Sequence, residues 1–128
     1  MNDGKGDRLG RVFFKSRDPD ALRDWYAKHL GIDMSEYGAS FAEDAARPGS
    51  TLWAPFVQET NYFAPSTKDF MFNFRVDELD ALLARLRADG VEIDPNVHED
   101  ENGRFGWIMD PEGTRIERWQ PPSATISA

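Results

Sequence analysis

The order of predicted elements in this chain occurs twice, and this internal repeat limits the possible folds more than any other feature. The tripeptide Asp-Ala-Leu stands at 20–22 and again 60 residues later, at 80–82. The glycines expected to end the two helices, Gly31 and Gly90, match after the loss of one residue. A few matched positions can arise by chance, but the shared order of elements favours a duplication.

Hydrophobic periodicity predicts a strand, a helix and three further strands in each half. The first half has a strand at 11–16, a helix from Asp18-Pro19 to Gly31, and short strands near 34–37, 40–43 and 51–56. The second half has a strand at 70–76, a helix capped by Asp77, and strands at 91–94, 105–109 and 115–119. Asp110-Pro111-Glu112-Gly113 predicts a turn between the last two strands.

The length of the chain, 128 residues, suits one domain and is too short for two ordinary ones. We expect a single domain over 9–121, with one module at about 9–57, a linker at about 58–69 and a second module at about 70–121. The small and polar residues of 1–8 and 122–128 predict a flexible arm and a flexible tail.

Composition excludes several classes of protein. The absence of cysteine rules out disulfides, thiolate-bound zinc and a catalytic thiol. The formal net charge of −8 argues against a nucleic-acid partner, because phosphate binding needs basic residues in excess or in a stripe. No apolar run is long enough for a membrane span or a secretory signal, so we expect no membrane partner and a cytoplasmic protein.

Several segments give the chain a resemblance to a known family. They are residues 13–19, Trp25-Tyr26, Leu30-Gly31, residues 74–81 and the closing stretch 105–117. In these segments the chain resembles the vicinal-oxygen-chelate superfamily, which includes glyoxalase I, the bleomycin-resistance proteins and the extradiol dioxygenases. The resemblance implies an α+β fold in which two βαβββ modules form a curled eight-stranded mixed sheet around a cleft, with the helices outside. It also implies a homodimer; the modules pair either within one chain or between two.

The resemblance also indicates where a metal would be bound. The family's ligands come from the first and last strands of each module, and the repeat places those positions at Arg11, Trp53, Met71 and Glu117. Only Glu117 is a suitable ligand for a divalent ion, because a guanidinium repels cations and neither an indole nor a thioether suits a hard metal. His29 and His98 are not expected to add ligands. We therefore expect no cofactor, with a divalent metal as the disfavoured alternative.

Alternation along the strands assigns their side chains to two faces. The residues expected beneath the helices are Val12, Phe14, Phe72, Phe74, Val76, Ile108 and Ile116. Those expected to line a ligand-binding cleft are Arg11, Phe13, Trp53, Phe56, Met71, Asn73, Arg75, Phe105, Trp107, Arg115 and Trp119, together with Glu117. The many aromatic side chains, Tyr62 and Phe63 among them, predict either ordinary core or a pocket that stacks a flat or cationic ligand.

Two interpretations of Arg11 and Glu117 stay open at this point. Either the two side chains pair and replace the metal electrostatically, or Arg11 binds an anionic or carbonyl group of a ligand while Glu117 is a catalytic base.

The sequence leaves three functions open. The first is a glyoxalase/bleomycin-resistance-like protein that binds a small aromatic or amphipathic molecule without the family's metal. The second is an enzyme: a metal-dependent lyase, isomerase or ring-cleavage dioxygenase, or a metal-free acid–base catalyst that uses Glu117. The third is a domain that only binds a protein partner.

Overall fold

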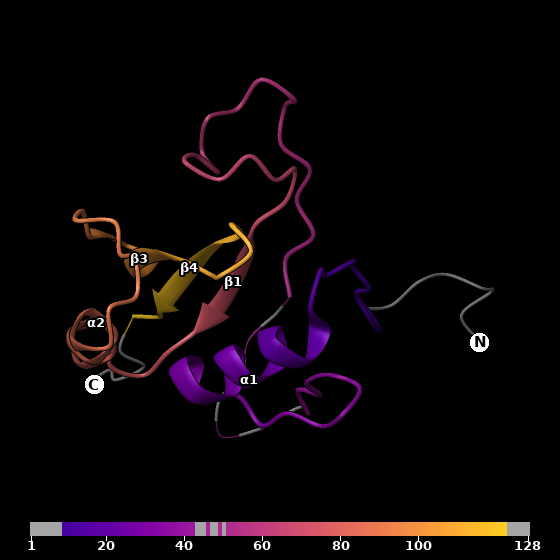
Figure 1. Ribbon diagram of the computed structural model, residues 1–128. Helices are drawn as coiled ribbons and strands as arrows, with labels where there is room; N and C mark the ends of the chain where they lie inside the picture. Colours follow the sequence, from indigo (N-terminus) through magenta and orange to yellow (C-terminus); the bar gives the residue numbers. More distant parts are fainter. Residues whose placement is uncertain (1–8, 43–45, 47–48, 50, 123–128) are drawn as a thin grey trace.

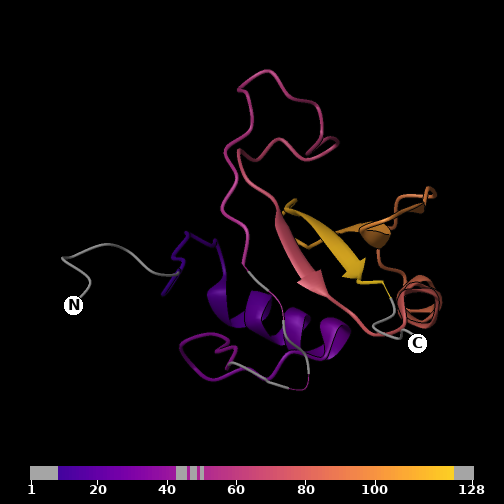
Figure 2. The ribbon, with the colours of Figure 1, turned by 180° about the vertical axis from the view of Figure 1, so that it is seen from behind.

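The computed structural model describes residues 9–42, 46, 49 and 51–122, and these form an α+β arrangement of two helices and four strands. The elements are α1 (Pro19–Leu30), β1 (Phe72–Arg75), α2 (Leu79–Ala88), β2 (His98–Asp100), β3 (Gly103–Met109) and β4 (Arg115–Gln120). Both helices lie on the same side of the sheet, as Figures 1 and 2 show. The predicted flexible arm and all but the first residue of the predicted tail fall outside the described residues.

The four strands form one mixed sheet in the order β1-β4-β3-β2. β4 pairs in parallel with β1 and antiparallel with β3, and β2 pairs antiparallel with β3. The second half of the chain therefore forms the predicted β-α-β-β-β unit, with its last strand between the first and the third. The second strand of that unit is β2 and not the predicted segment 91–94, where Ile93 makes only an isolated bridge to Ile108.

The predicted helix after Asp18 is confirmed. The carboxylate of Asp18 accepts a hydrogen bond of 3.2 Å from the Ala21 N–H, and Pro19 occupies the first turn, where no N–H is needed. Gly31 ends α1 with a φ of 66°, a left-handed conformation that glycine adopts without strain.

The predicted cap of the second helix is wrong. Glu78, not Asp77, precedes α2, and its side chain makes no capping hydrogen bond. The side-chain oxygen of Gln120, at the end of β4, accepts a 2.8 Å hydrogen bond from the Leu79 N–H instead. The free N–H at the start of α2 is therefore bound by a residue of β4, and not by the residue just before the helix that the sequence pattern predicts.

The hydrophobic core lies between the helices and the sheet. Its buried members are Leu22, Tyr26, Leu30, Leu79, Leu82, Leu83, Leu86, Ile108 and Ile116, and Phe74 and Val76 pack against them. Ile108 and Ile116 are cross-strand neighbours on the helix side of β3 and β4, as the alternation predicted. Gly106 lets α2 approach β3, because a Cβ there would lie 3.1 Å from the Leu83 Cδ1 atom.

The strands predicted in the first half are not formed. Residues 11–16 and 51–56 have no regular structure, and the segment near 34–37 contains only a bridge between Ser35 and Gly38. The segment 40–43 has no strand at 40–42, and residue 43 lies outside the described residues. A strand needs a hydrogen-bonding neighbour, and within the described chain these segments find none. Their side chains are accordingly open to solvent, with Phe13 84% and Trp53 77% exposed.

No helix in the described part of the chain is long and apolar enough to cross a membrane. The cytoplasmic location expected from the sequence stays a prediction.

Candidate functional site

A hydrogen-bonded carboxylate lies at the centre of the sheet face opposite the helices, which we call the open face. Glu117 on β4 has Asn73 on β1 and Trp107 on β3 as its cross-strand neighbours. The Asn73 amide donates to Glu117 Oε1 at 2.7 Å, and the Trp107 indole N–H donates to Oε2 at 3.1 Å. Glu117 is only 8% exposed, so these donors replace the water that its charge would otherwise need.

A third donor to Glu117 comes from outside the sheet. The Tyr62 hydroxyl, in the loop before β1, donates a hydrogen bond to Glu117 Oε2. Burial, and then the bond to Glu117, raise the pKa of Tyr62 to about 12. The phenol therefore keeps its proton at neutral pH and stays a donor. In Figure 1 this loop rises above the sheet between α1 and β1.

The cation near Glu117 is Arg115, not Arg11. Arg115 lies two residues before Glu117 on the same face of β4, and its guanidinium stacks over the Trp107 ring at 5.2 Å. Asp94 holds the other side of Arg115 at 3.4 Å. A pocket of about 180 Å³ opens beside this group, with Arg115, Asp94, Trp107 and Pro65 among its walls.

Aromatic side chains border the carboxylate on two sides. Phe56 stacks on Tyr62 with ring centroids 5.8 Å apart, and Phe63 contacts both rings. Further along the sheet, Phe105 and Trp119 stack at 6.4 Å. The Arg75 guanidinium lies 5.6 Å from the centre of the Trp119 ring. The open face therefore offers flat apolar surface on both sides of one fixed negative charge.

The structure brings some of the predicted site residues together and leaves others apart. The open face contains seven of them: Asn73, Arg75, Phe105, Trp107, Arg115, Glu117 and Trp119. Met71 directly precedes β1. Phe56 does not contact Glu117 itself but stacks on Tyr62, which does. The interpretation in which Arg11 pairs with Glu117 is not observed: Tyr62, Asn73 and Trp107 bind the carboxylate, and Arg11 is exposed. Phe13 and Trp53 are likewise exposed on the unpaired first half.

Sequence reasoning missed the part that Tyr62 and Asp94 play in this site. Tyr62 lies in no periodic segment, and Asp94, at the end of the predicted strand 91–94, was not assigned to the cleft. The cluster of aromatic residues between 56 and 63 was the only signal for Tyr62 in the sequence.

The side chains of the open face do not fit a divalent metal. No three His, Asp or Glu side chains converge anywhere in the described ranges. Both oxygens of Glu117 already accept hydrogen bonds, and its neighbours Asn73, Trp107 and Tyr62 present donor hydrogens to it. A cation would have to displace these donors and would still lack further ligands.

The sequence model of the glyoxalase/bleomycin resistance protein/dioxygenase superfamily matches residues 8–118. The fold and the matched length define a protein of the vicinal-oxygen-chelate type. The chain belongs to this superfamily, and the resemblance noted in the sequence is confirmed.

Solved structures similar to this chain include both binding proteins and enzymes. TnmS3, an antibiotic-binding protein of Streptomyces sp. CB03234, is 25% identical, with a TM-score of 0.48 over 81% of this chain and 87% of its own. Lactoylglutathione lyase of Agrobacterium tumefaciens is 18% identical, with a TM-score of 0.48 over 82% and 87% of the two chains. The trypanothione-dependent glyoxalase I of Leishmania major is 19% identical, with a TM-score of 0.46 over 80% and 78%. None of the curated proteins compared with the chain matches it.

Proposed function

We propose that this protein binds a small aromatic or amphipathic molecule on the open face, without a metal. The observation that carries the proposal is the buried Glu117 carboxylate, which three side-chain donors fix between two sets of aromatic rings. Flat apolar walls with a few oriented polar groups are typical of small-molecule sites. The positive charge of Arg115 can bind a negative or carbonyl group of the ligand, and the negative charge of Glu117 can bind a positive group of the ligand.

A metal-free acid–base enzyme is the second candidate, favoured by the contact between a phenol and a carboxylate. Tyr62 and Glu117 are a proton donor and a proton acceptor in direct hydrogen-bonded contact. However, a substrate proton would have to displace one of the three donors before it reached Glu117. Binding therefore ranks above catalysis in our proposal, and metal-dependent lyase, isomerase or dioxygenase chemistry ranks below both.

We propose that a second copy of the chain completes the fold as a homodimer. β1 lies at the edge of the described sheet, and most apolar side chains of 11–16 and 51–56 are left exposed by the described residues of one chain. An identical copy carries the same strand edge and the same apolar segments. In a two-fold arrangement each copy can therefore pair with the free edge of the other and cover its exposed apolar side chains. In that arrangement residues 9–57 supply the other four strands of the expected eight, and residues 58–69 link the two modules.

Ligand binding tests the proposed function directly. We would titrate the protein with bleomycin and with a series of planar aromatic compounds, and follow thermal stabilisation and heat of binding. We expect at least one compound to stabilise the protein. Phe56→Ala should weaken its binding by about two- to tenfold, because one stacking ring is lost. Tyr37→Ala is the matched control, since Tyr37 is 89% exposed and makes no ring contact with the site. Equal weakening by both variants, or no stabilisation by any compound, would contradict the proposal and favour a partner-binding module.

Two further measurements separate binding from catalysis. Elemental analysis of the purified protein should find no stoichiometric nickel, zinc, iron or manganese; one metal ion per chain would overturn the metal-free proposal. We expect Glu117→Gln to change the affinity for the ligand. If the wild-type protein converts any ligand, we expect the variant to convert it at the same rate. If the wild-type protein converts a ligand and Glu117→Gln does not, Glu117 is a catalytic residue and the second candidate replaces the first.

A further inference from the structure

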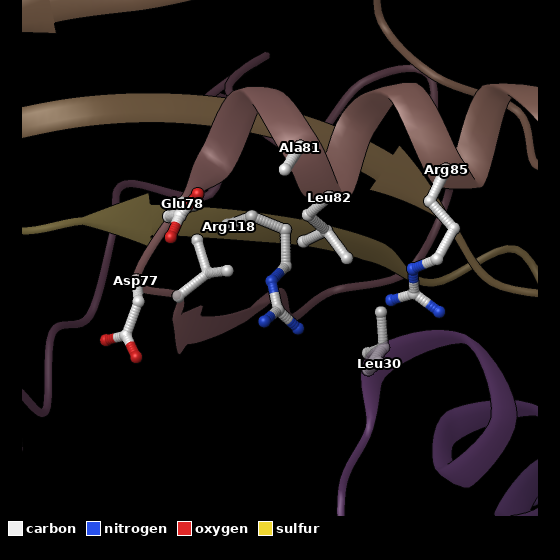
Figure 3. A pocket seen from close by; sticks show the side chains of 8 residues that line it. Leu30, Asp77, Glu78, Ala81, Leu82, Arg85 and Arg118 are labelled. Carbon is white, nitrogen blue, oxygen red and sulfur yellow. The ribbon is translucent and has the colours of Figure 1, made fainter.

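A second pocket lies on the helix side of the sheet, away from the open face. It has a volume of about 440 Å³ and is bounded by the end of α1, by α2 and by β4. Figure 3 shows Arg85 and Arg118 both directed toward Leu30 in this pocket. None of its walls belongs to the group around Glu117.

Arg118 is buried in this pocket, and no described residue gives it a negatively charged partner. It is only 4% exposed, and its Nε and Nη1 atoms have no hydrogen-bond partner. Among the described residues its one polar contact is a 3.2 Å hydrogen bond that Nη2 donates to the Arg75 carbonyl. The guanidinium also lies 5.7 Å from the centre of the Phe74 ring. A buried arginine with two unused donors is costly unless an anion completes its surroundings.

Arg85 adds a second positive charge to the same pocket. Its guanidinium donates to the carbonyls of His29 at 2.9 Å and Lys28 at 3.5 Å, so it is held against the end of α1. No carboxylate within the described ranges forms an ion pair with Arg85 or Arg118. Burial, and then the nearby charge of Arg85, lower the pKa of Arg118 to about 10, so Arg118 is still charged at neutral pH.

The other walls of the pocket are mainly apolar. Leu30, Val76, Ala81 and Leu82 line it, and Figure 3 shows the carboxylates of Asp77 and Glu78 on the side away from Arg85. The volume falls within the range of about 300–1,000 Å³ typical of small-molecule sites and exceeds what an inorganic anion needs.

We propose that this pocket binds a small amphipathic organic anion. The carboxylate or phosphate group lies between Arg85 and Arg118, and the apolar part rests on Leu30, Val76 and Leu82. The anion supplies acceptors for the unused donors of Arg118 and neutralises two like charges. The site is independent of the ligand site on the open face.

Isothermal titration calorimetry with three probes tests this proposal. Octanoate has both the anionic group and the apolar tail, acetate has the anionic group alone, and 1-octanol has the tail alone. We expect saturable binding of octanoate that is at least about tenfold tighter than the binding of acetate or 1-octanol, because each probe lacks one half of the contacts. Equal affinity for octanoate and 1-octanol would overturn the proposal.

Two arginine variants locate the binding. Arg85→Gln should weaken octanoate binding by at least about tenfold, whereas Arg87→Gln, on the same helix but not in the pocket, should leave it unchanged. Arg118→Met should abolish octanoate binding and raise the melting temperature, since an unpaired buried charge is removed. Binding that survives Arg85→Gln but is lost in Phe56→Ala belongs to the open face and would overturn the proposal, while leaving the proposed function intact.

Discussion

The Tyr26 hydroxyl donates a 2.7 Å hydrogen bond to Asp110 Oδ2 and so joins α1 to the turn between β3 and β4. The other oxygen of Asp110 accepts from the backbone N–H groups of Glu112 at 2.8 Å and Thr114 at 2.9 Å. Burial, and then the bond to Asp110, raise the pKa of Tyr26 well above its ordinary value, so the phenol stays a donor. The turn predicted at 110–113 thus positions the first helix as well as connecting two strands.

Removal of this hydroxyl should destabilise the protein. Tyr26→Phe removes the donor to Oδ2 of the buried Asp110 carboxylate, and we expect the free energy of unfolding to fall by about 1–3 kcal/mol. Urea unfolding followed by circular dichroism measures the change. Tyr37→Phe, at an exposed position, should change the free energy by less than about 0.5 kcal/mol. Equal effects of the two variants would contradict a structural role for the bond.

Glu112 should make the attachment of α1 sensitive to acid. Its carboxylate accepts from the Ser16 hydroxyl at 2.7 Å and from the backbone N–H groups of Arg17 and Asp18, and the Ser16 bond is the main cause of its lowered pKa. A lowered pKa in the folded state means that this stabilisation is present above pH 4.5 and is lost as the pH falls through the folded value.

Unfolding measured between pH 7 and pH 3 tests the role of Glu112. Glu112→Gln should be less stable than the wild type at pH 7 and lose less stability on acidification. Glu101→Gln, in the exposed turn between β2 and β3, should follow the wild-type profile. Parallel profiles of wild type and Glu112→Gln would show that the carboxylate charge does not hold α1.

The contact between Tyr62 and Glu117 should appear in an alkaline titration. The raised pKa of about 12 means that the Tyr62 proton contributes stability that is complete below pH 10 and is lost as the pH rises through 12. Glu117→Gln removes the negative charge, so Tyr62 should ionise at lower pH, although burial still acts on it. Tyrosinate absorbance measures the shift, and Tyr62→Phe assigns the step. Glu59→Gln, in the same loop, is the control; an unchanged titration in Glu117→Gln would disprove the contact.

The proposed homodimer should depend on Trp53. Trp53→Glu places a charge where the second copy would cover an indole, and we expect the dimer dissociation constant to rise by at least about thirtyfold. Sedimentation equilibrium at several protein concentrations measures the constant. Val97→Glu, which also replaces an exposed apolar side chain but lies beside β2, should leave it unchanged. A wild-type protein that is monomeric at all concentrations would refute the dimer.

The sequence predicted well those features that depend on residues close together in the chain. The cap and the end of α1 follow from local spacing, and both are observed. The alternation that separates Ile116 from Glu117 also holds, because side chains along a strand must alternate.

Features that depend on contacts between distant residues could not be predicted in this way. The N–H at the start of α2 is bound by Gln120 and not by Asp77, and the carboxylate of Glu117 is bound by Tyr62 and not by Arg11. Each of these contacts joins two segments that are far apart in the sequence, and no repeating pattern relates the two. The strand at 98–100 is acidic, short and without alternation, so the sequence did not predict it, whereas pairing with β3 forms it. The pattern at 11–16 and 51–56 predicted strands that are not formed, because alternation contains no information on whether a hydrogen-bonding partner is present.

The position of β4 between β1 and β3 has a consequence for biosynthesis. Residues 72–75, which form β1, leave the ribosome well before β4, the strand that pairs with them. β1 therefore joins the sheet only after β4 has been made. Until then α2 can pack only against β3, where Gly106 faces Leu83, and it lacks the contact with Ile116 of β4. Maturation of this half is therefore a late, concerted event rather than a stepwise addition of strands in order of synthesis.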